Sequence, residues 1–263
     1  MHLSEETMGL NYYEQGSGPV LVLLHGLGLD HSIWLPLARN CSSDMRMIMP
    51  DLRGHGLSES PDGIFTMGDM AADIKQLLDR LNVEKIVITG HSMGGYVALA
   101  FVRKYPDLVD GLILVTTNAD EDPPEKRTSR ILLAKEIGQK GSIAMADSLA
   151  NRLTNDPTLA LKMHAMISKT TPNGLIGASL GMAERKDMHQ TLRSLTCPVL
   201  VIAGERDKIT PLFTSQDMVN TCQSGELVIV PNTGHLPMME EPDLMSKAFF
   251  TFLKAKNLLG CQY

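Results

Sequence analysis

Residues 85–100 constrain the fold of this chain more than any other stretch. A β-branched run at 86–89 is followed by the pentapeptide G-H-S-M-G at 90–94 and then directly by helix-forming residues. The pattern G-x-S-x-G between a strand and a helix predicts a tight turn that exposes the Ser92 hydroxyl above a sheet. Such a turn strains the backbone, and side chains at its two glycine positions would clash, so glycine is required there.

A serine hydroxyl needs a base to become a nucleophile, and the base needs an orienting partner. Two later strand-like runs end at residues of these types: 197–203 is followed by Asp207, and 227–230 is followed by His235. In a parallel sheet the carboxyl ends of the strands meet at one edge. We therefore expect Ser92, Asp207 and His235 to form a catalytic triad of nucleophile, acid and base.

A fourth element lies near the start of the chain. The apolar run at 20–24 predicts a buried strand, and His25-Gly26-Leu27-Gly28 follows it. Glycines let the backbone turn so that an amide points at the nucleophile. We expect the amides of Leu27 and Met93 to form an oxyanion hole, because Met93 follows the nucleophile directly.

Together these motifs resemble the α/β-hydrolase superfamily, in its small carboxylesterase and enol-lactonase branch. The resemblance runs from about residue 10 to residue 253 and includes D-L-R-G-H-G-L-S at 51–58. It implies an α/β fold with a mostly parallel central sheet of about eight strands, helices on both faces and a helical lid. Some members carry the acid after the preceding strand, where Asp120 lies, so Asp120 is the alternative to Asp207.

Strand and helix alternate along most of the chain, which indicates a mostly parallel sheet. We expect strands at 10–14, 20–24, 46–49, 86–89, 112–116, 197–203 and 227–230, and helices at 32–38, 69–81 and 93–104. Between 120 and 195 only helical runs occur, at 130–137, 143–153, 157–168 and 175–185. The prediction is a core domain of residues 1–119 and 196–263, with a lid at 120–195 inserted over the site. The alternative is a small second domain that never contacts substrate.

The predicted lid is rich in methionine and leucine and poor in aromatic residues. Methionine is flexible and polarizable, so a cavity of this composition suits an apolar acyl or alkyl group of modest size. The alternative is that these side chains only hold the lid helices together. The residues expected to bind substrate are His25, Gly26, Trp34, Met145, Met166 and Leu236. His25 is also expected to fix the oxyanion loop by hydrogen bonds.

The resulting prediction is a carboxylesterase-like serine hydrolase that cleaves small-molecule esters or lactones through an acyl-enzyme. Ser92 argues against haloalkane dehalogenases and epoxide hydrolases, which resemble this chain but carry aspartate at that position. Three alternatives remain open: a carbon–carbon bond hydrolase of the same fold, a perhydrolase, and a receptor that turns a small ligand over slowly.

Composition excludes several other classes. A formal net charge of −6 argues against a nucleic-acid partner. No apolar run is long enough to span a bilayer. We also expect no secretory signal, because the first residues lack a basic segment followed by an apolar run. The four cysteines, at 41, 197, 222 and 261, are far apart and predict reduced thiols in a cytoplasmic protein. No metal or cofactor is expected, and the chain is expected to be a monomer or a homodimer.

Overall fold

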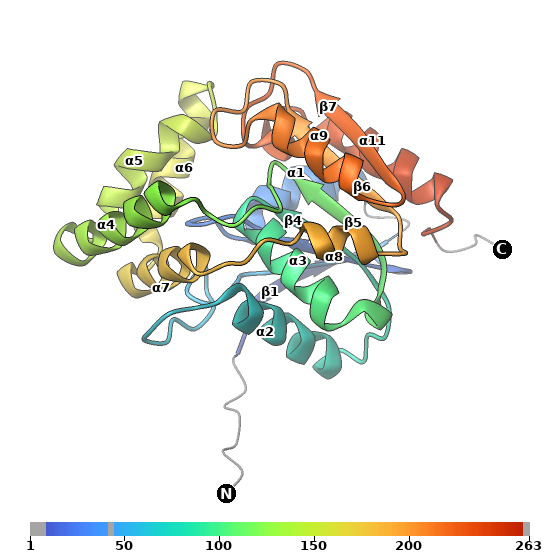
Figure 1. Ribbon diagram of the computed structural model, residues 1–263, viewed down its shortest axis with the longest axis horizontal. Coiled ribbons are helices and arrows are strands. Elements are labelled where there is room, and N and C mark those ends of the chain that lie inside the picture. Colours follow the sequence, from blue (N-terminus) through green and yellow to red (C-terminus); the bar gives the residue numbers. More distant parts are fainter. Residues whose placement is uncertain (1–8, 42–44, 260–263) are drawn as a thin grey trace, which may run out of the picture.

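A mostly parallel sheet organises the chain (Figure 1). The computed structural model describes residues 9–41 and 45–259. The strands are β1 (Tyr12–Gln15), β2 (Val20–Leu24), β3 (Arg46–Pro50), β4 (Ile86–His91), β5 (Val109–Val115), β6 (Val199–Gly204) and β7 (Gly225–Val230). They pair in the order β1-β3-β2-β4-β5-β6-β7, and β1 alone of these strands is antiparallel to its neighbour. Each strand predicted from the residue pattern is present, so the described residues form seven strands. The expected number of about eight came from the family resemblance, and no run of residues had been assigned to an eighth strand.

The helices follow the alternation that the sequence predicts. They are η1 (His31–Trp34), α1 (Leu35–Cys41), α2 (Met67–Arg80), α3 (Met93–Lys104), η2 (Pro106–Leu108), α4 (Pro124–Lys140), α5 (Ile143–Leu153), α6 (Pro157–Lys169), α7 (Pro172–Ala183), α8 (His189–Ser194), α9 (Leu212–Thr221), α10 (Pro237–Glu240) and α11 (Pro242–Ala255).

Both faces of the sheet are buried, which explains the continuous apolar runs of its central strands. Within β2, Leu21 and Leu23 join one apolar cluster, whereas Val22 and Leu24 join the other, because successive side chains of a strand point to opposite faces. Helices α2, α3, α8 and α9 contribute to the cluster on one face, and α1 and α11 contribute to the cluster on the other.

Helices α4 to α7 stand together beside the sheet, between β5 and β6 in sequence (Figure 1). Helix α4 packs against α5 and α7, and α5 packs against α6. Helices α4 and α7 begin earlier than predicted, because Pro124 and Pro172 occupy the first turn, where proline favours a helix. Helix α8 packs against α3 and α9 instead, so the helical insertion proper comprises α4 to α7.

Two glycines of α7 allow this helix to pack closely against the loop between β3 and α2. A Cβ atom at Gly174 would overlap the carbonyl oxygen of Gly54, and one at Gly181 would overlap that of Phe65. These two glycines lie one heptad apart, on the same face of α7. Both glycines are therefore points of close backbone approach.

None of the described helices is long and apolar enough to cross a lipid bilayer. Cys197 and Cys222 are free thiols. Burial raises the pKa of Cys222 to about 11 and also raises the pKa of Cys197, so both stay protonated at neutral pH. The side chain of Cys41, and all of Cys261, lie outside the described residues.

Candidate active site

Ser92 connects β4 to α3 in a conformation that few residues adopt. Its φ of 53° and ψ of −116° place it in a strained region of the backbone map. A Cβ atom at Gly90 would overlap the carbonyl of Gly94, and one at Gly94 would lie 2.5 Å from the carbonyl oxygen of Leu24. The turn therefore requires glycine at both positions, as the motif predicts.

His235 and Asp207 meet beside this turn. His235 Nδ1 lies 2.7 Å from Asp207 Oδ2, and each side chain is 1% exposed. The second carboxylate oxygen, Oδ1, accepts hydrogen bonds from the amides of Ile209 at 2.8 Å and Thr210 at 3.1 Å. A carboxylate held in this way keeps the proton of the imidazole on Nδ1 and leaves Nε2 free to accept one.

Asp120, the alternative acid, lies elsewhere. Its side chain is exposed, and it belongs to a surface cluster with His189 and Asp217. Its carbonyl oxygen accepts a hydrogen bond from Arg185 Nε at 3.0 Å. Asp207 is thus the carboxylate that the structure brings to His235.

Three further hydrogen bonds hold the backbone of His235. His91 Nε2 donates to its carbonyl oxygen at 2.9 Å, and Thr116 Oγ1 donates to the same oxygen at 3.0 Å. The amide of His235 donates to the carbonyl oxygen of Leu153, at the end of α5, at 2.8 Å. Burial, followed by the neighbouring His235, lowers the pKa of His91 well below its ordinary value, so His91 is a neutral donor. This loop is therefore fixed to both the sheet and the insertion.

The loop after β2 lies directly against Ser92. A Cβ atom at Gly26 would lie 2.8 Å from His91 Nδ1 and 3.2 Å from the Cβ of Ser92. His25 Nδ1 donates to the carbonyl oxygen of Gly26 at 2.8 Å, and its Nε2 accepts from the amide of Leu52 at 2.8 Å. These bonds require a neutral ring, and burial lowers the pKa of His25 accordingly.

The two residues whose amides are predicted to form the oxyanion hole, Leu27 and Met93, both lie close to Ser92. Leu27 lines a cavity together with Ser92. Met93 is the first residue of α3, and the first backbone N–H groups of a helix have no acceptor within the helix. An oxyanion-hole role for these amides stays a prediction.

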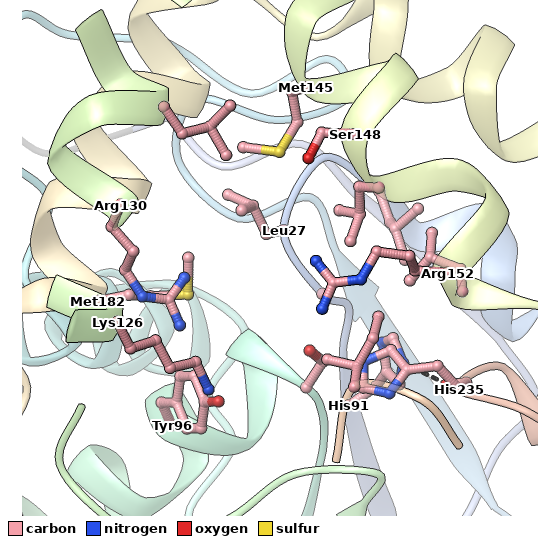
Figure 2. Close-up of a pocket in the computed structure, with 17 residues that line it drawn as sticks. Leu27, His91, Tyr96, Lys126, Arg130, Met145, Ser148, Arg152, Met182 and His235 are labelled. Atoms are coloured by element: carbon pink, nitrogen blue, oxygen red, sulfur yellow. Dashed lines mark hydrogen bonds between the residues drawn. The ribbon is translucent and has the colours of Figure 1, made fainter. Parts of the chain in front are cut away.

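A cavity of about 140 Å³ opens above Ser92 and His235, between the sheet edge and the insertion (Figure 2). Of the residues predicted to bind substrate, Gly26 and Met145 line it. Its apolar wall consists of Leu27, Leu29, Leu133, Met145, Leu149, Leu153, Met182 and Ile209. Most of this wall comes from α4 and α5 and from the loop after β2.

The other four residues predicted to bind substrate do not line this cavity. His25, Trp34 and Leu236 are completely buried behind the wall, where Trp34 meets the ring of His91 edge-on. Met166, on α6, lines a separate groove with Lys162 and Lys169. The sequence shows that these residues are apolar or near a motif, but not on which side of the wall they lie.

The polar part of the cavity lining was not predicted from the sequence. It consists of Tyr96, Lys126, Arg130, Ser148 and Arg152. A signal was available: positions 126, 130 and 133 share one face of a helix, and so do 145, 148, 149 and 152.

Among the described residues, two groups of side chains outside the cavity carry metal-ligand atoms within 4.8 Å of one another: Asp30 with His31 and Asp51, and the surface cluster around Asp120. In the first group, Asp51 Oδ1 accepts hydrogen bonds from the amide and Nδ1 of His31, both at 2.8 Å. Its Oδ2 accepts from Asn11 and Leu57. These bonds give Asp51 a structural role.

Comparison with known proteins agrees with this architecture. The family model described as alpha/beta hydrolase fold matches residues 19–242. A thermophilic esterase from Thermogutta terrifontis, solved with malate bound, superimposes with a TM-score of 0.93 at 37% identity, covering 97% of this chain and 96% of that one. The enol-lactonase from Burkholderia xenovorans has a TM-score of 0.87 at 25% identity, covering 95% and 98%.

Curated relatives are of similar length. A 2-(acetamidomethylene)succinate hydrolase from Mesorhizobium japonicum is 28% identical, over 94% of this chain and 92% of its own length. A 3-oxoadipate enol-lactonase from Acinetobacter baylyi is 25% identical, over 97% of each chain. With the family model spanning most of the sequence, the chain belongs to the α/β-hydrolase family.

Proposed function

We propose that this protein is a serine hydrolase of small carboxylic esters or lactones. Ser92 is the nucleophile, His235 the base and Asp207 the acid that orients it. One observation carries the proposal: the buried contact of 2.7 Å between His235 and Asp207 lies at a cavity that Ser92 and His235 both line. The strained turn at Ser92 supports it, because strain of this kind persists where a function requires it.

The reaction proceeds in two halves. His235 Nε2 takes the proton of Ser92 as the hydroxyl attacks the carbonyl carbon, and Asp207 stabilises the imidazolium. The amides of Leu27 and Met93 receive the oxyanion. His235 then protonates the leaving alcohol, and water repeats the sequence on the acyl-enzyme to release the acid.

Helices α4 to α7 act as the lid in this proposal. Their leucine and methionine side chains supply the apolar contacts for a small or medium acyl group, and they exclude water from the carbonyl. The hydrogen bond from the His235 amide to Leu153 joins the lid to the base, so lid position and base position are coupled.

The names of the relatives support hydrolysis, but they differ in the kind of bond that they indicate is cleaved. One is named as a succinate-derivative hydrolase, two as enol-lactonases and one as an esterase. Their shared architecture is compatible with attack by a serine on a carbonyl carbon. We assign ester and lactone cleavage to this chain because three of these four names describe it.

A serine-directed fluorophosphonate label tests the proposal. The purified protein should incorporate one label and hydrolyse 4-nitrophenyl butyrate, and Ser92→Ala should lose both. Ser148→Ala is the matched control, because Ser148 supplies another serine hydroxyl in the same cavity lining and should keep the label. Labelling without turnover beyond one equivalent would favour a ligand receptor, and labelling at another serine would refute the assignment.

A further inference from the structure

Three lysine and arginine side chains line the candidate active site, and none of the described residues that line it is acidic. Lys126 and Arg130 come from α4, and Arg152 comes from α5. Figure 2 shows Lys126 and Arg130 on one side of the cavity and Arg152 on the other, all directed toward the space between them. The sign of this charge is opposite to the formal net charge of the whole chain, which is −6.

Only part of this positive charge is neutralised within the protein. Asp122 is completely buried and pairs with Arg130, with Arg185 at 2.7 Å and with Lys126 at 3.6 Å. Burial alone would raise the pKa of Asp122, but Arg130 and Arg185 outweigh it and lower the pKa, so Asp122 stays ionised. One carboxylate therefore faces three cations, and an excess of positive charge remains beside the cavity.

Arg152 is the cation most available to a ligand. It is exposed, and within residues 9–41 and 45–259 it forms neither an ion pair nor a side-chain hydrogen bond. Its position is nevertheless defined, because the next residue, Leu153, accepts the hydrogen bond from the amide of His235. This bond fixes the backbone beside Arg152 near the proposed base, and the Arg152 side chain lines the same cavity as Ser92 and His235.

We propose that the substrate carries a free carboxylate, which Arg152 binds with help from Lys126 while the scissile ester or lactone carbonyl lies at Ser92. This inference rests on the proposed function and specifies its substrate class. A guanidinium offers two parallel donors that match the two oxygens of a carboxylate. The cavity of about 140 Å³ is small, which favours monoesters or lactones of short dicarboxylic acids.

Two isosteric esters provide the test. Monoethyl glutarate carries the carboxylate, and ethyl 4-carbamoylbutanoate replaces it with a neutral carboxamide. Ethanol release by the full-length protein should give a kcat/KM about tenfold or more higher for the carboxylate ester, the scale of one charged hydrogen bond. This preference should shrink as salt is added, because salt screens the exposed Arg152.

Variants locate the preference. Arg152→Gln should bring the ratio of the two kcat/KM values toward one, Arg152→Lys should retain part of it, and Lys126→Gln should lower it less. Lys140→Gln is the matched control, because Lys140 is also on α4 but pairs with Glu136 and does not line the cavity. Its ratio should equal that of the unmodified protein. Glutarate should inhibit hydrolysis of 4-nitrophenyl butyrate, and Arg152→Gln should weaken that inhibition about tenfold.

The outcomes separate this inference from the proposed function. Hydrolysis of both esters at equal rates, or a ratio that survives Arg152→Gln and Lys126→Gln together, overturns the carboxylate assignment and leaves the serine hydrolase intact. If neither these esters nor 4-nitrophenyl butyrate is cleaved and Ser92 takes no fluorophosphonate label, the proposed function fails, and the carboxylate assignment fails with it.

Discussion

The sheet edge and the helical insertion meet at one cavity, but different constraints hold them. At the sheet edge, backbone lies against backbone: Gly90 and Gly94 leave no room for a Cβ atom. On α4 the situation is the reverse, since a Cβ atom at Gly138 would approach nothing closer than 4.0 Å. The edge that carries Ser92 is therefore fixed by its fold, whereas α4 offers surface positions that tolerate change.

This contrast suggests that the sheet edge and the helical insertion have different roles. The sheet edge supplies the groups proposed for bond cleavage, which must be positioned to within a fraction of an ångström. Helices α4 and α5 supply the cations and apolar side chains proposed for substrate choice, where shape and charge matter more than strict geometry. Substitutions in the two regions should consequently differ in both size and kind of effect.

The largest effect is expected at the acid. Asp207→Asn should lower kcat for a neutral ester by about 10⁴-fold, because the amide cannot hold His235 in the required tautomer. Asp120→Asn is the control and should stay within about twofold, since Asp120 is exposed and does not contact His235. Steady-state kinetics and thermal denaturation of both variants provide the measurement. Full activity in Asp207→Asn beside an inactive Asp120→Asn would reverse the assignment.

Gly90→Ala should strongly destabilise the sheet edge. The added methyl would overlap the carbonyl of Gly94, which is backbone and cannot rotate away, so the loss should be about 3 kcal/mol or more. Gly111→Ala, in β5 of the same sheet, is the control, because its methyl would crowd the end of the flexible Leu258 side chain and would meet Val87 at an ordinary contact distance of 3.6 Å. Urea denaturation compares the two. Equal midpoints would show that the turn has more room than the structure indicates.

Sequence reasoning was most successful where the backbone itself was constrained. Each predicted strand is present, and Asp207 and His235 meet as expected, because a parallel sheet brings residues that follow its strands to one edge. The glycines at 90 and 94 predicted the turn, because the backbone there leaves no room for a Cβ atom. A backbone that admits one residue type leaves a pattern that can be recognised in a single sequence.

Sequence reasoning was weaker on the cavity wall. Trp34 and Leu236 proved to be buried behind it, and the cations at 126, 130 and 152 were missed. Helical spacing groups residues on a face, but the packing of one helix against others decides which face meets the cavity. Asp122 pairs with Arg130, which lines the cavity. Asp122 also pairs with Arg185, which lies far along the chain, so this arrangement likewise depends on contacts that local sequence does not reveal.

A smaller effect is expected from the buried histidines beside the sheet edge. Burial, followed by the charge of His25, lowers the pKa of His55 to about 3, and burial also lowers the pKa values of His25 and His91. Below about pH 6.5 the unfolded chain therefore binds more protons than the folded one. The free energy of unfolding should fall by about 1.4 kcal/mol per pH unit for each such histidine as the pH drops from 6.5 to 5.

One histidine acts in the opposite direction. Burial would lower the pKa of His189, but the hydrogen bonds and charges of Asp187, Asp120 and Asp217 together outweigh burial and raise it. The contribution of His189 to stability is therefore present at low pH and is lost as the pH rises. The net slope should still follow the buried histidines, which are more numerous. Urea denaturation at pH 7.5 and pH 5 measures it, and His55→Asn should reduce the slope by about one proton. An unchanged slope in this variant would mean that His55 titrates alike in both states.

The smallest effect, and the only gain, is expected on α4. Gly138→Ala should stabilise the protein by about 0.5 kcal/mol, because alanine restricts the unfolded chain and its methyl would meet only Ile176 Cδ1, at 4.0 Å. Gly141→Ala, three residues further on, has equally open surroundings but a φ of 76°, so it should be destabilising by about 1 kcal/mol. Urea denaturation resolves the pair. A loss of stability in Gly138→Ala would mean that this helix is packed as tightly as the sheet edge, and the contrast between the two regions would no longer hold.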